Sequence, residues 1–285
     1  MAKLHRGIMS RASLFVILFT AASLAAAFLV PAMPQPVAYH DFADRRAVLG
    51  VANFLDVASN AGFLLAGIAG IVVVLRRRTV FEHPAERWPY AIFFLGVLLT
   101  AAGSAYYHLA PDNERLFWDR LPMTVAFMSL IAAQVVDRIS VRGGLALLAP
   151  LLLVGAASVV YWLATERAGA GNVIPYGLLQ GYAVVMMLLL AALYRSRYTR
   201  GADIYWVFGA YLAAKLFETL DDPLLRLGGL LSGHSLKHLA AAFAGFMVCR
   251  MLWRRVLEPA ATAAPRPPTD HARRVPPPEG SASIR

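Results

Sequence analysis

The feature that most constrains this sequence is a series of apolar runs, each about 20 residues long, that recur from one end of the chain to the other. A helix of that length spans the hydrocarbon core of a bilayer. We predict about eight such helices. Their ranges are 12–33, 53–75, 89–109, 121–139, 143–164, 173–194, 204–220 and 233–253. Only 15% of the residues are charged, whereas soluble domains have about a quarter, so an all-α membrane protein is expected.

The basic residues between these runs predict how the chain is oriented in the membrane. Every second connector is rich in arginine, and the residues concerned are Arg76, Arg77, Arg78 and Arg87, Arg138 and Arg142, Arg195, Arg197 and Arg200, and Arg254 and Arg255. By the positive-inside rule these connectors and both termini are cytoplasmic. The net charge of +10 is therefore explained by membrane flanks, and no nucleic-acid partner is expected.

Both ends of the chain differ from its middle. Residues 1–40 contain a basic start and an Ala-rich apolar run, which predicts either an extra N-terminal membrane helix or a cleaved signal segment. Residues 41–256 contain the other seven predicted helices. Residues 257–285 are rich in Pro, Ala and Arg and lack the apolar side chains needed for a core, so we expect a disordered cytoplasmic tail.

Three histidines are the candidate metal ligands. His234 and His238 are four residues apart, so a helix places both on one face. His108, at the same predicted end of another helix, completes a set of three ligands that leaves a zinc ion one open position. The single cysteine, Cys249, excludes a cysteine-rich site. The alternative is that these are interfacial or hydrogen-bonded histidines without a metal.

Ser104 and Asp119 are the other polar residues near this end that we consider as candidates. Ser104 precedes His108 by one helical turn, although a serine in a membrane helix often only bonds back to its own backbone. Asp119 precedes Pro122, a residue suited to the first turn of a helix. Its alternative role is a capping carboxylate paired with Arg120. The inner halves of the predicted helices are almost purely apolar.

Three short motifs resemble the alkaline ceramidases, a family of seven-helix membrane amidohydrolases in a superfamily with the adiponectin-receptor-like proteins. They are GSAYYH at 103–108, WDRLPM at 118–123 and GHSLKH at 233–238. The serine-to-histidine, histidine-to-aspartate and HxxxH spacings all agree with that family. Residues 54–60 are similar to its first helix, so the resemblance covers about residues 41–253. Two features differ from the family pattern: the extra N-terminal segment, and Lys237, which stands where the family has an aromatic residue.

The resemblance implies a function and a set of roles. His108, His234 and His238 would bind zinc, Asp119 would handle the proton of water, and Ser104 would stabilise the developing oxyanion. The substrate would be ceramide or another N-acyl lipid, with no obligate protein partner. Asp41, Asp44 and Asn53 are the candidate calcium ligands. Because Arg46 and Asn53 stand where the family has an amide and a carboxylate, we expect calcium to have little effect.

Two other functions are compatible with the same residues. A transporter or channel would use the cluster to relay protons or a metal ion, and it predicts charged residues along a path to the cytoplasm. A receptor or sensor would hold zinc structurally and fill its fourth position with a protein ligand.

Overall fold

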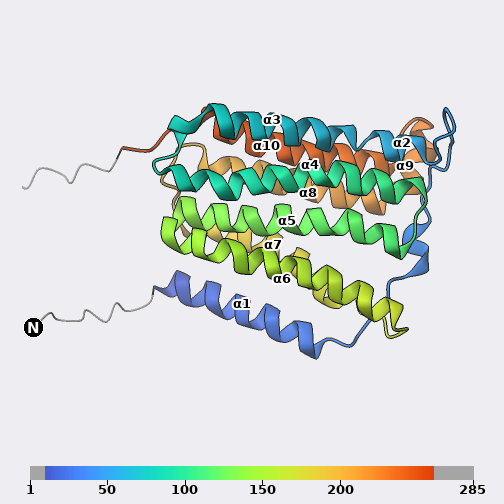
Figure 1. Ribbon diagram of the computed structural model, residues 1–285, viewed down its shortest axis with the longest axis horizontal. Helices are drawn as coiled ribbons and strands as arrows, with labels where there is room; N and C mark the ends of the chain where they lie inside the picture. Colours follow the sequence, from blue (N-terminus) through green and yellow to red (C-terminus); the bar gives the residue numbers. More distant parts are fainter. Residues whose placement is uncertain (1–9, 260–285) are drawn as a thin grey trace, which may run out of the picture.

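The computed structural model describes residues 10–259, which form a bundle of helices running up and down along one axis (Figure 1). The helices are α1 Arg11–Leu29, α2 Phe54–Ala58, α3 Ala61–Arg76, α4 Arg87–Leu109, α5 Asn113–Arg138, α6 Val141–Arg167, α7 Ile174–Leu193, α8 Ile204–Thr219, α9 Asp221–Gly228 and α10 Gly233–Arg254. Within the described range the only β-type pairings are two isolated bridges. The all-α prediction is confirmed, and the predicted tail lies outside the described residues from 260 onward.

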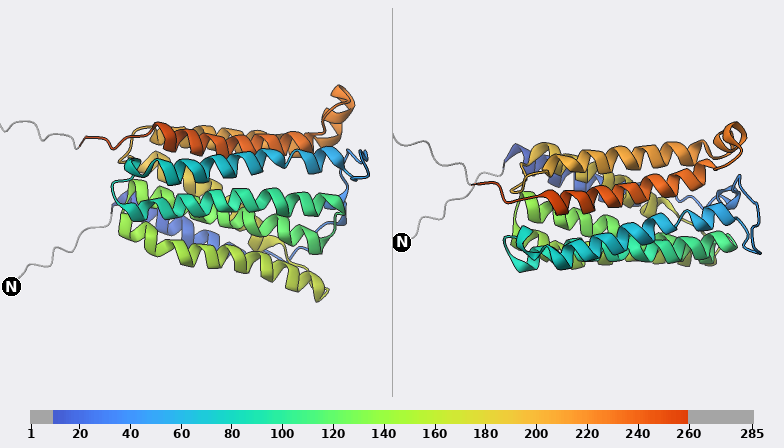
Figure 2. Two further views of the ribbon diagram at one scale, coloured as in Figure 1. Left: turned by 45° about the horizontal axis from the view of Figure 1, so that its top comes forward. Right: turned by 90° about the horizontal axis from the view of Figure 1, so that it is seen from above.

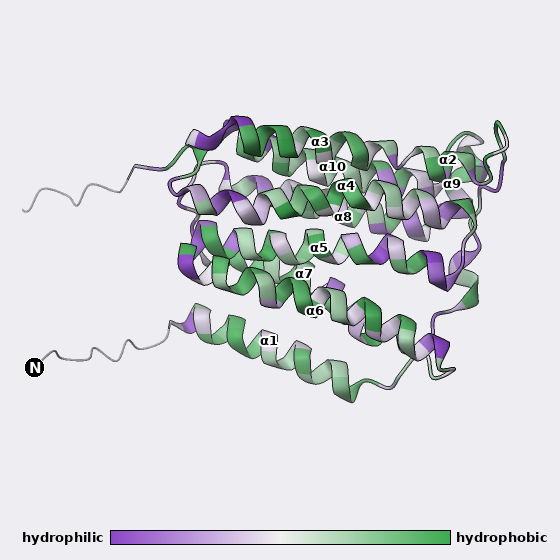
Figure 3. Ribbon diagram, viewed as in Figure 1, coloured by the Kyte–Doolittle hydropathy of each residue, from purple (hydrophilic) through white to green (hydrophobic). Residues whose placement is uncertain are grey.

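The bundle is that of a multi-pass membrane protein. Seven helical segments in the described range are long and apolar enough to cross a membrane, namely Arg11–Leu29, Phe54–Arg76, Pro84–Leu109, Asn113–Arg138, Val141–Arg167, Ile174–Leu193 and Gly233–Arg254. The predicted segment 204–220 forms α8, whose 16 residues span about 24 Å, less than the roughly 30 Å of a bilayer core. Figure 3 shows apolar residues along the middle of the bundle and hydrophilic residues at its two ends.

The helices α3, α4, α5 and α6 pack in sequence order, and α10 closes the other side by packing on both α3 and α8 (Figures 1 and 2). Helix α1 lies at the margin against α7, where the Phe19 and Tyr182 rings stack with centroids 5.6 Å apart. None of its residues is buried. The two interpretations of this segment, a retained membrane helix and a cleaved signal, both stay predictions.

Helix α5 begins eight residues before the predicted position, and this corrects the interpretation of its first turns. Its N-cap is Asp112, whose carboxylate accepts a hydrogen bond from the Arg115 amide at 2.7 Å. Pro122 therefore lies inside the helix, where it leaves the carbonyl of Trp118 without its usual donor. Gly103 of α4 packs directly on that carbonyl, since a Cβ added to Gly103 would lie 2.0 Å from the Trp118 oxygen.

Two further features of the fold were not expected. The second predicted helix is interrupted between α2 and α3, where the Asn60 side chain donates to the Asp56 carbonyl at 2.8 Å. Helix α9 follows α8 as a short separate helix that ends at Gly228 and is capped by Gly229, whose φ of +66° is one that glycine adopts readily. Both features lie at the end of the bundle that carries the histidines.

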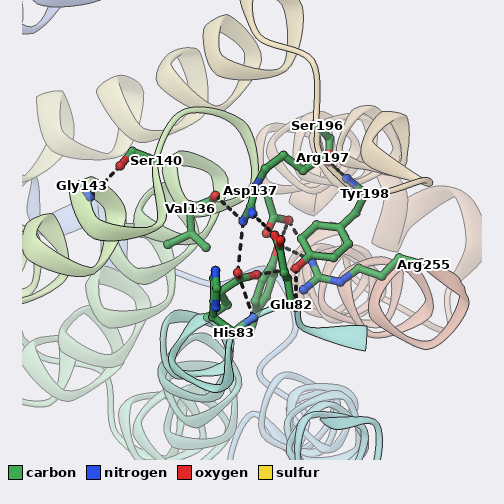
Figure 4. A network of polar contacts seen from close by, with 12 residues as sticks. Glu82, His83, Val136, Asp137, Ser140, Gly143, Ser196, Arg197, Tyr198 and Arg255 are labelled. Atoms are coloured by element: carbon green, nitrogen blue, oxygen red, sulfur yellow. Dashed lines mark hydrogen bonds and ion pairs between the residues drawn. The ribbon is translucent and has the colours of Figure 1, made fainter. Parts of the chain in front are cut away.

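A second buried polar cluster occupies the opposite end of the bundle, which the apolar pattern did not predict (Figure 4). Arg255 pairs with Asp137 at 2.8 Å, and Tyr90 donates to the same carboxylate at 2.6 Å. Tyr198 donates to Glu86 at 2.5 Å, and burial together with this carboxylate raises the pKa of Tyr198 to about 12. Sequence-distant loops are thus joined at this end, and apolar core residues separate it from the histidines.

Candidate metal centre

The three histidines come together at one end of the bundle because of where their helices begin and end. His108 lies in the last turn of α4, and His234 and His238 lie in the first two turns of α10. The start of α10 is fixed by its N-cap Ser232, which accepts from the Ser235 amide, and by Asp221, which accepts from the His234 amide at 2.8 Å. The two helix ends therefore present their imidazoles to the same point.

The arrangement of the rings suits a metal ion. All three histidines are buried, and one ligand nitrogen from each lies within 4.8 Å of the others. The Nε2 atoms of His108 and His234 are 3.2 Å apart. Two imidazole nitrogens bound tetrahedrally to zinc at 2.0–2.1 Å lie about 3.3 Å apart, so the observed separation fits a shared ion. The predicted group of three histidines is confirmed as one that can hold a metal.

A hydrogen-bond chain behind His238 sets which of its nitrogens is free. Ser59 lies 2.8 Å from His238 Nδ1, and its hydroxyl donates to the Asp56 carbonyl at 3.0 Å. A hydroxyl has one hydrogen, so the serine oxygen accepts from an Nδ1–H of His238. The neutral ring then carries its lone pair on Nε2, the tautomer that a metal requires.

The segment between α1 and α2 covers the histidines from outside. The Phe42 ring packs against the rings of His108 and His234, with centroids 4.5 and 4.4 Å apart. The Ala43 amide donates to Asp221 at 3.0 Å, which ties this segment to α9. Asn53 donates to the His108 carbonyl at 2.8 Å and so supports the end of α4. Phe42 thus covers two of the imidazole rings, and Asn53 fixes the end of the helix that carries one of them.

The candidate calcium residues Asp41, Asp44 and Asn53 each have a different partner. Asp44 is buried, and both of its oxygens accept hydrogen bonds from Arg46, at 2.8 and 2.7 Å. This guanidinium holds the pKa of the Asp44 carboxyl below its ordinary value. Asp41 is exposed and pairs with Arg45. In the described chain no group of potential metal-binding carboxylates and imidazoles contains Asp41 or Asp44, and Arg46 already neutralises the buried carboxylate.

A cavity of about 430 Å³ lies beside the histidines. Ser104, Asp119 and His238 all line it, so the structure brings both predicted catalytic residues to a cavity that also contains one of the three histidines. Asp119 is buried inside α5, and the cap is Asp112, so the capping interpretation of Asp119 is wrong. Arg120, the partner of Asp119 in that alternative, donates instead to the Gln35 side chain. The other walls are mostly apolar and include Phe63, Phe93, Val97, Met187, Val207 and Phe208.

Several cavity residues were not identified from the sequence. Lys215 of α8 lines the cavity, although the polar residues of this helix follow no clear pattern. Gln35 and Tyr39 come from the linker after α1. The backbone amide of Gln35 donates to the Glu166 carboxylate at 2.6 Å, which attaches this linker to α6. The N-terminal segment therefore supplies part of the cavity wall, a contribution that only the tertiary contacts reveal.

Comparison with protein-family models and with curated proteins finds no match to this chain. The resemblance to the alkaline ceramidases therefore stays a prediction from three motifs. The structure adds that Ser104, Asp119 and His238, one residue from each motif, line one cavity, and that His108 and His234 lie beside His238 in the histidine group.

Proposed function

We propose that the protein is a zinc-dependent membrane amidohydrolase that cleaves the N-acyl bond of ceramide or a related lipid to a fatty acid and an amine. The observation that carries this proposal is the position of the buried histidine group beside Ser104 and Asp119 at the polar end of an apolar cavity. The motif resemblance adds the reaction type. Lipid amides suit the site because their acyl chains match the apolar walls.

The donor set supports zinc as the metal. Imidazole is a common zinc ligand, and three ligands with one open position are typical of catalytic sites. When bound, the ion supplies a Lewis acid and lowers the pKa of its water toward 7. The histidine group in the described chain has three members, whereas a structural zinc site in a sensor would have four protein ligands. This count favours the hydrolase over the sensor.

The residues of the chain have separable tasks in this mechanism. The Asp119 carboxylate accepts a proton from the attacking water and returns it to the leaving amine. The Ser104 hydroxyl donates to the substrate carbonyl oxygen as negative charge develops there. Ser59 holds the His238 ring in position. Because the cavity is buried and mostly apolar, the interactions of Ser104 and Asp119 with the substrate are stronger than they would be in water.

We further propose that the cavity lies on the non-cytoplasmic side, with both termini cytoplasmic. The arginine-rich connectors lie at the opposite end of the bundle from the histidines, and there Arg77 stacks on Trp253 near the end of α10. The apolar core between the two ends argues against a transport path for charged species. A lipid would enter the cavity from the outer leaflet.

Metal analysis tests the centre. Purified protein is expected to contain about one zinc ion per chain, because three imidazoles and a water complete a tetrahedral shell. The double variant His234→Ala/His238→Ala should lose the metal, whereas His40→Ala, a histidine at the same end that belongs to no potential metal group of the described chain, should keep it. Equal zinc in the wild type and the double variant would refute the assignment.

Lipidomics tests the reaction. Purified zinc-loaded protein is incubated with lipid extracts, and mass spectrometry follows the N-acyl lipids. We expect a loss of one lipid class with matched gains of fatty acid and free amine. Unchanged N-acyl lipids alongside stoichiometric zinc would favour the sensor.

A further inference from the structure

A cluster of charges that the proposed mechanism does not use lies at the polar end of the cavity. Lys237, between two of the histidines on α10, donates to Glu218 at 2.9 Å and lies 3.3 Å from His234 Nε2. Lys215 pairs with the other oxygen of Glu218. One carboxylate of α8 therefore holds two ammonium groups, both of which line the cavity.

Arg120 adds a third cation to the lining. Its side chain is 4% exposed and stacks on Trp162 and Tyr176, with the guanidinium carbon 4.2 and 4.6 Å from the ring centroids. Its hydrogen-bond partner is the neutral Gln35, at 2.6 Å. The Nη1 atom is buried and has no partner in the described chain. Arg120 is thus held firmly, but its charge is not neutralised by an ion pair.

The charged groups that line the cavity are Lys215, Lys237, Arg120, Glu218 and Asp119. The Lys215 side chain is about half exposed, so water screens its charge. The buried positive charges of Lys237 and Arg120 face at most two negative ones, and a metal ion bound by the histidines would add positive charge without a counter-ion. Burying an uncompensated charge among apolar side chains is unfavourable, so a ligand that brings its own negative charge gains affinity here.

We propose that this cavity selects acyl amides whose amine portion carries an acidic group, a carboxylate or a phosphate, close to the scissile bond. Lys237 is the main specificity-determining residue, because its ammonium lies beside the histidine group at which the amide must be placed. Arg120 contributes positive charge from α5, and Lys215 contributes a partly screened one from α8. The acyl chain occupies the apolar part of the cavity. This inference rests on the proposed amidohydrolase function and narrows its substrate class.

Binding measurements with matched ligands test the proposal independently of turnover. The ligands are N-dodecanoylglycine, its neutral analogue N-dodecanoylglycinamide and N-dodecanoylethanolamine phosphate. Equilibrium dissociation constants are measured on detergent-purified protein, both as isolated and after metal removal. We expect the wild type to bind at least one acid about 10- to 100-fold more tightly than the neutral amide, as removal of one charge-assisted hydrogen bond implies. The acid with the larger preference identifies the headgroup.

Variants assign the preference to its residue. Lys237→Met should reduce the preference at least fivefold and leave the affinity for the neutral amide nearly unchanged, while Lys237→Arg should retain it. Arg226→Gln, on the exposed face of α9, serves as the control for general loss of positive charge. Thermal unfolding of each variant identifies any that fail to fold.

Equal binding of acid and neutral amide by the wild type would overturn the proposal. So would a preference that persists in Lys237→Met but disappears on metal removal, because the metal alone would then bind the acid. Failure of the hydrolase proposal is distinguishable, since it would appear as acid-selective binding without turnover of any N-acyl ligand.

Discussion

Individual hydrogen bonds decide whether the histidines can act as ligands. His238 is usable because Ser59 accepts from its Nδ1 and leaves Nε2 facing the other rings. Ser59 is in turn held by the Asp56 carbonyl, and the Asp56 carboxylate accepts from Ser235 at 2.7 Å. The first turn of α10 and the interruption between α2 and α3 are therefore linked through side chains behind the metal group.

Removal of the Ser59 hydroxyl should weaken metal binding without removing a ligand. Loss of such an outer hydrogen bond typically lowers metal affinity 10- to 100-fold. We expect a Ser59→Ala protein to show that reduction in a competition titration with a zinc chelator. Ser158→Ala is the matched control, because that buried serine bonds only to its own helix at the Gly155 carbonyl. Equal zinc affinity in the Ser59 variant and the control would contradict the role of Ser59.

Replacement of Asp119 separates proton transfer from structure. Asp119→Asn keeps the shape of the side chain but removes the base, so turnover of an N-acyl lipid should fall about 100- to 10,000-fold while zinc stays bound. Asp112→Ala removes the actual cap of α5 and should cost about 1 kcal/mol of stability with turnover nearly unchanged. Turnover and zinc are measured on the same preparation, and near-normal turnover in Asp119→Asn would end its assignment as the base.

At the scale of elements, close helix packing brings the motif of α4 beside that of α5. Gly103 permits α4 to contact the Trp118 carbonyl that Pro122 leaves free in α5. Ser104 follows Gly103 in the chain, and Asp119 follows Trp118. Both therefore reach the cavity. Gly103 and Pro122, which belong to the motifs that resemble the ceramidases, thus also allow α4 and α5 to pack closely.

A Cβ at position 103 should force α4 and α5 apart. Because the clash is with backbone, Gly103→Ala should destabilise the protein by about 1–3 kcal/mol. Gly181→Ala in α7 has no atom within 4 Å of the added Cβ and should stabilise the helix by roughly 0.5–1 kcal/mol. Thermal unfolding in detergent compares the two, and a Gly103 variant as stable as the Gly181 variant would disprove the tight contact.

At the scale of the whole molecule, the bundle has two polar ends with different contents. One end holds the histidines and the cavity charges, and the other holds the network of Asp137, Glu86 and Arg255 with the arginine-rich connectors. On the positive-inside rule we propose that the second end faces the cytoplasm. That assignment decides which leaflet supplies the substrate.

Accessibility labelling checks the orientation. In a Cys249→Ser background, single cysteines at Thr79 and Arg195 should be protected from an impermeant thiol reagent in intact cells, because both lie at the arginine-rich end. A cysteine at Leu227, which is 87% exposed at the other end, should react. The reverse labelling pattern would place the cavity on the cytoplasmic side and remove the argument for an outer-leaflet substrate.

The sequence by itself determined the helical class, most helix positions and the three histidines. The length of an apolar run and an i, i+4 spacing of two residues are local features that can be identified without knowing the tertiary structure. The sequence also selected Ser104 and Asp119 through their motifs. Only the tertiary structure decided that Asp112, and not Asp119, caps α5, that Arg46 neutralises Asp44, and that Gln35, Lys215 and Arg120 meet at one cavity. The cavity depends on contacts between residues far apart in the chain, which no local pattern encodes. The Asp112 cap and the Asp44–Arg46 pair are short-range contacts, but several polar groups lie near each one, and the start of α5 and the path of the linker decide which of them meet.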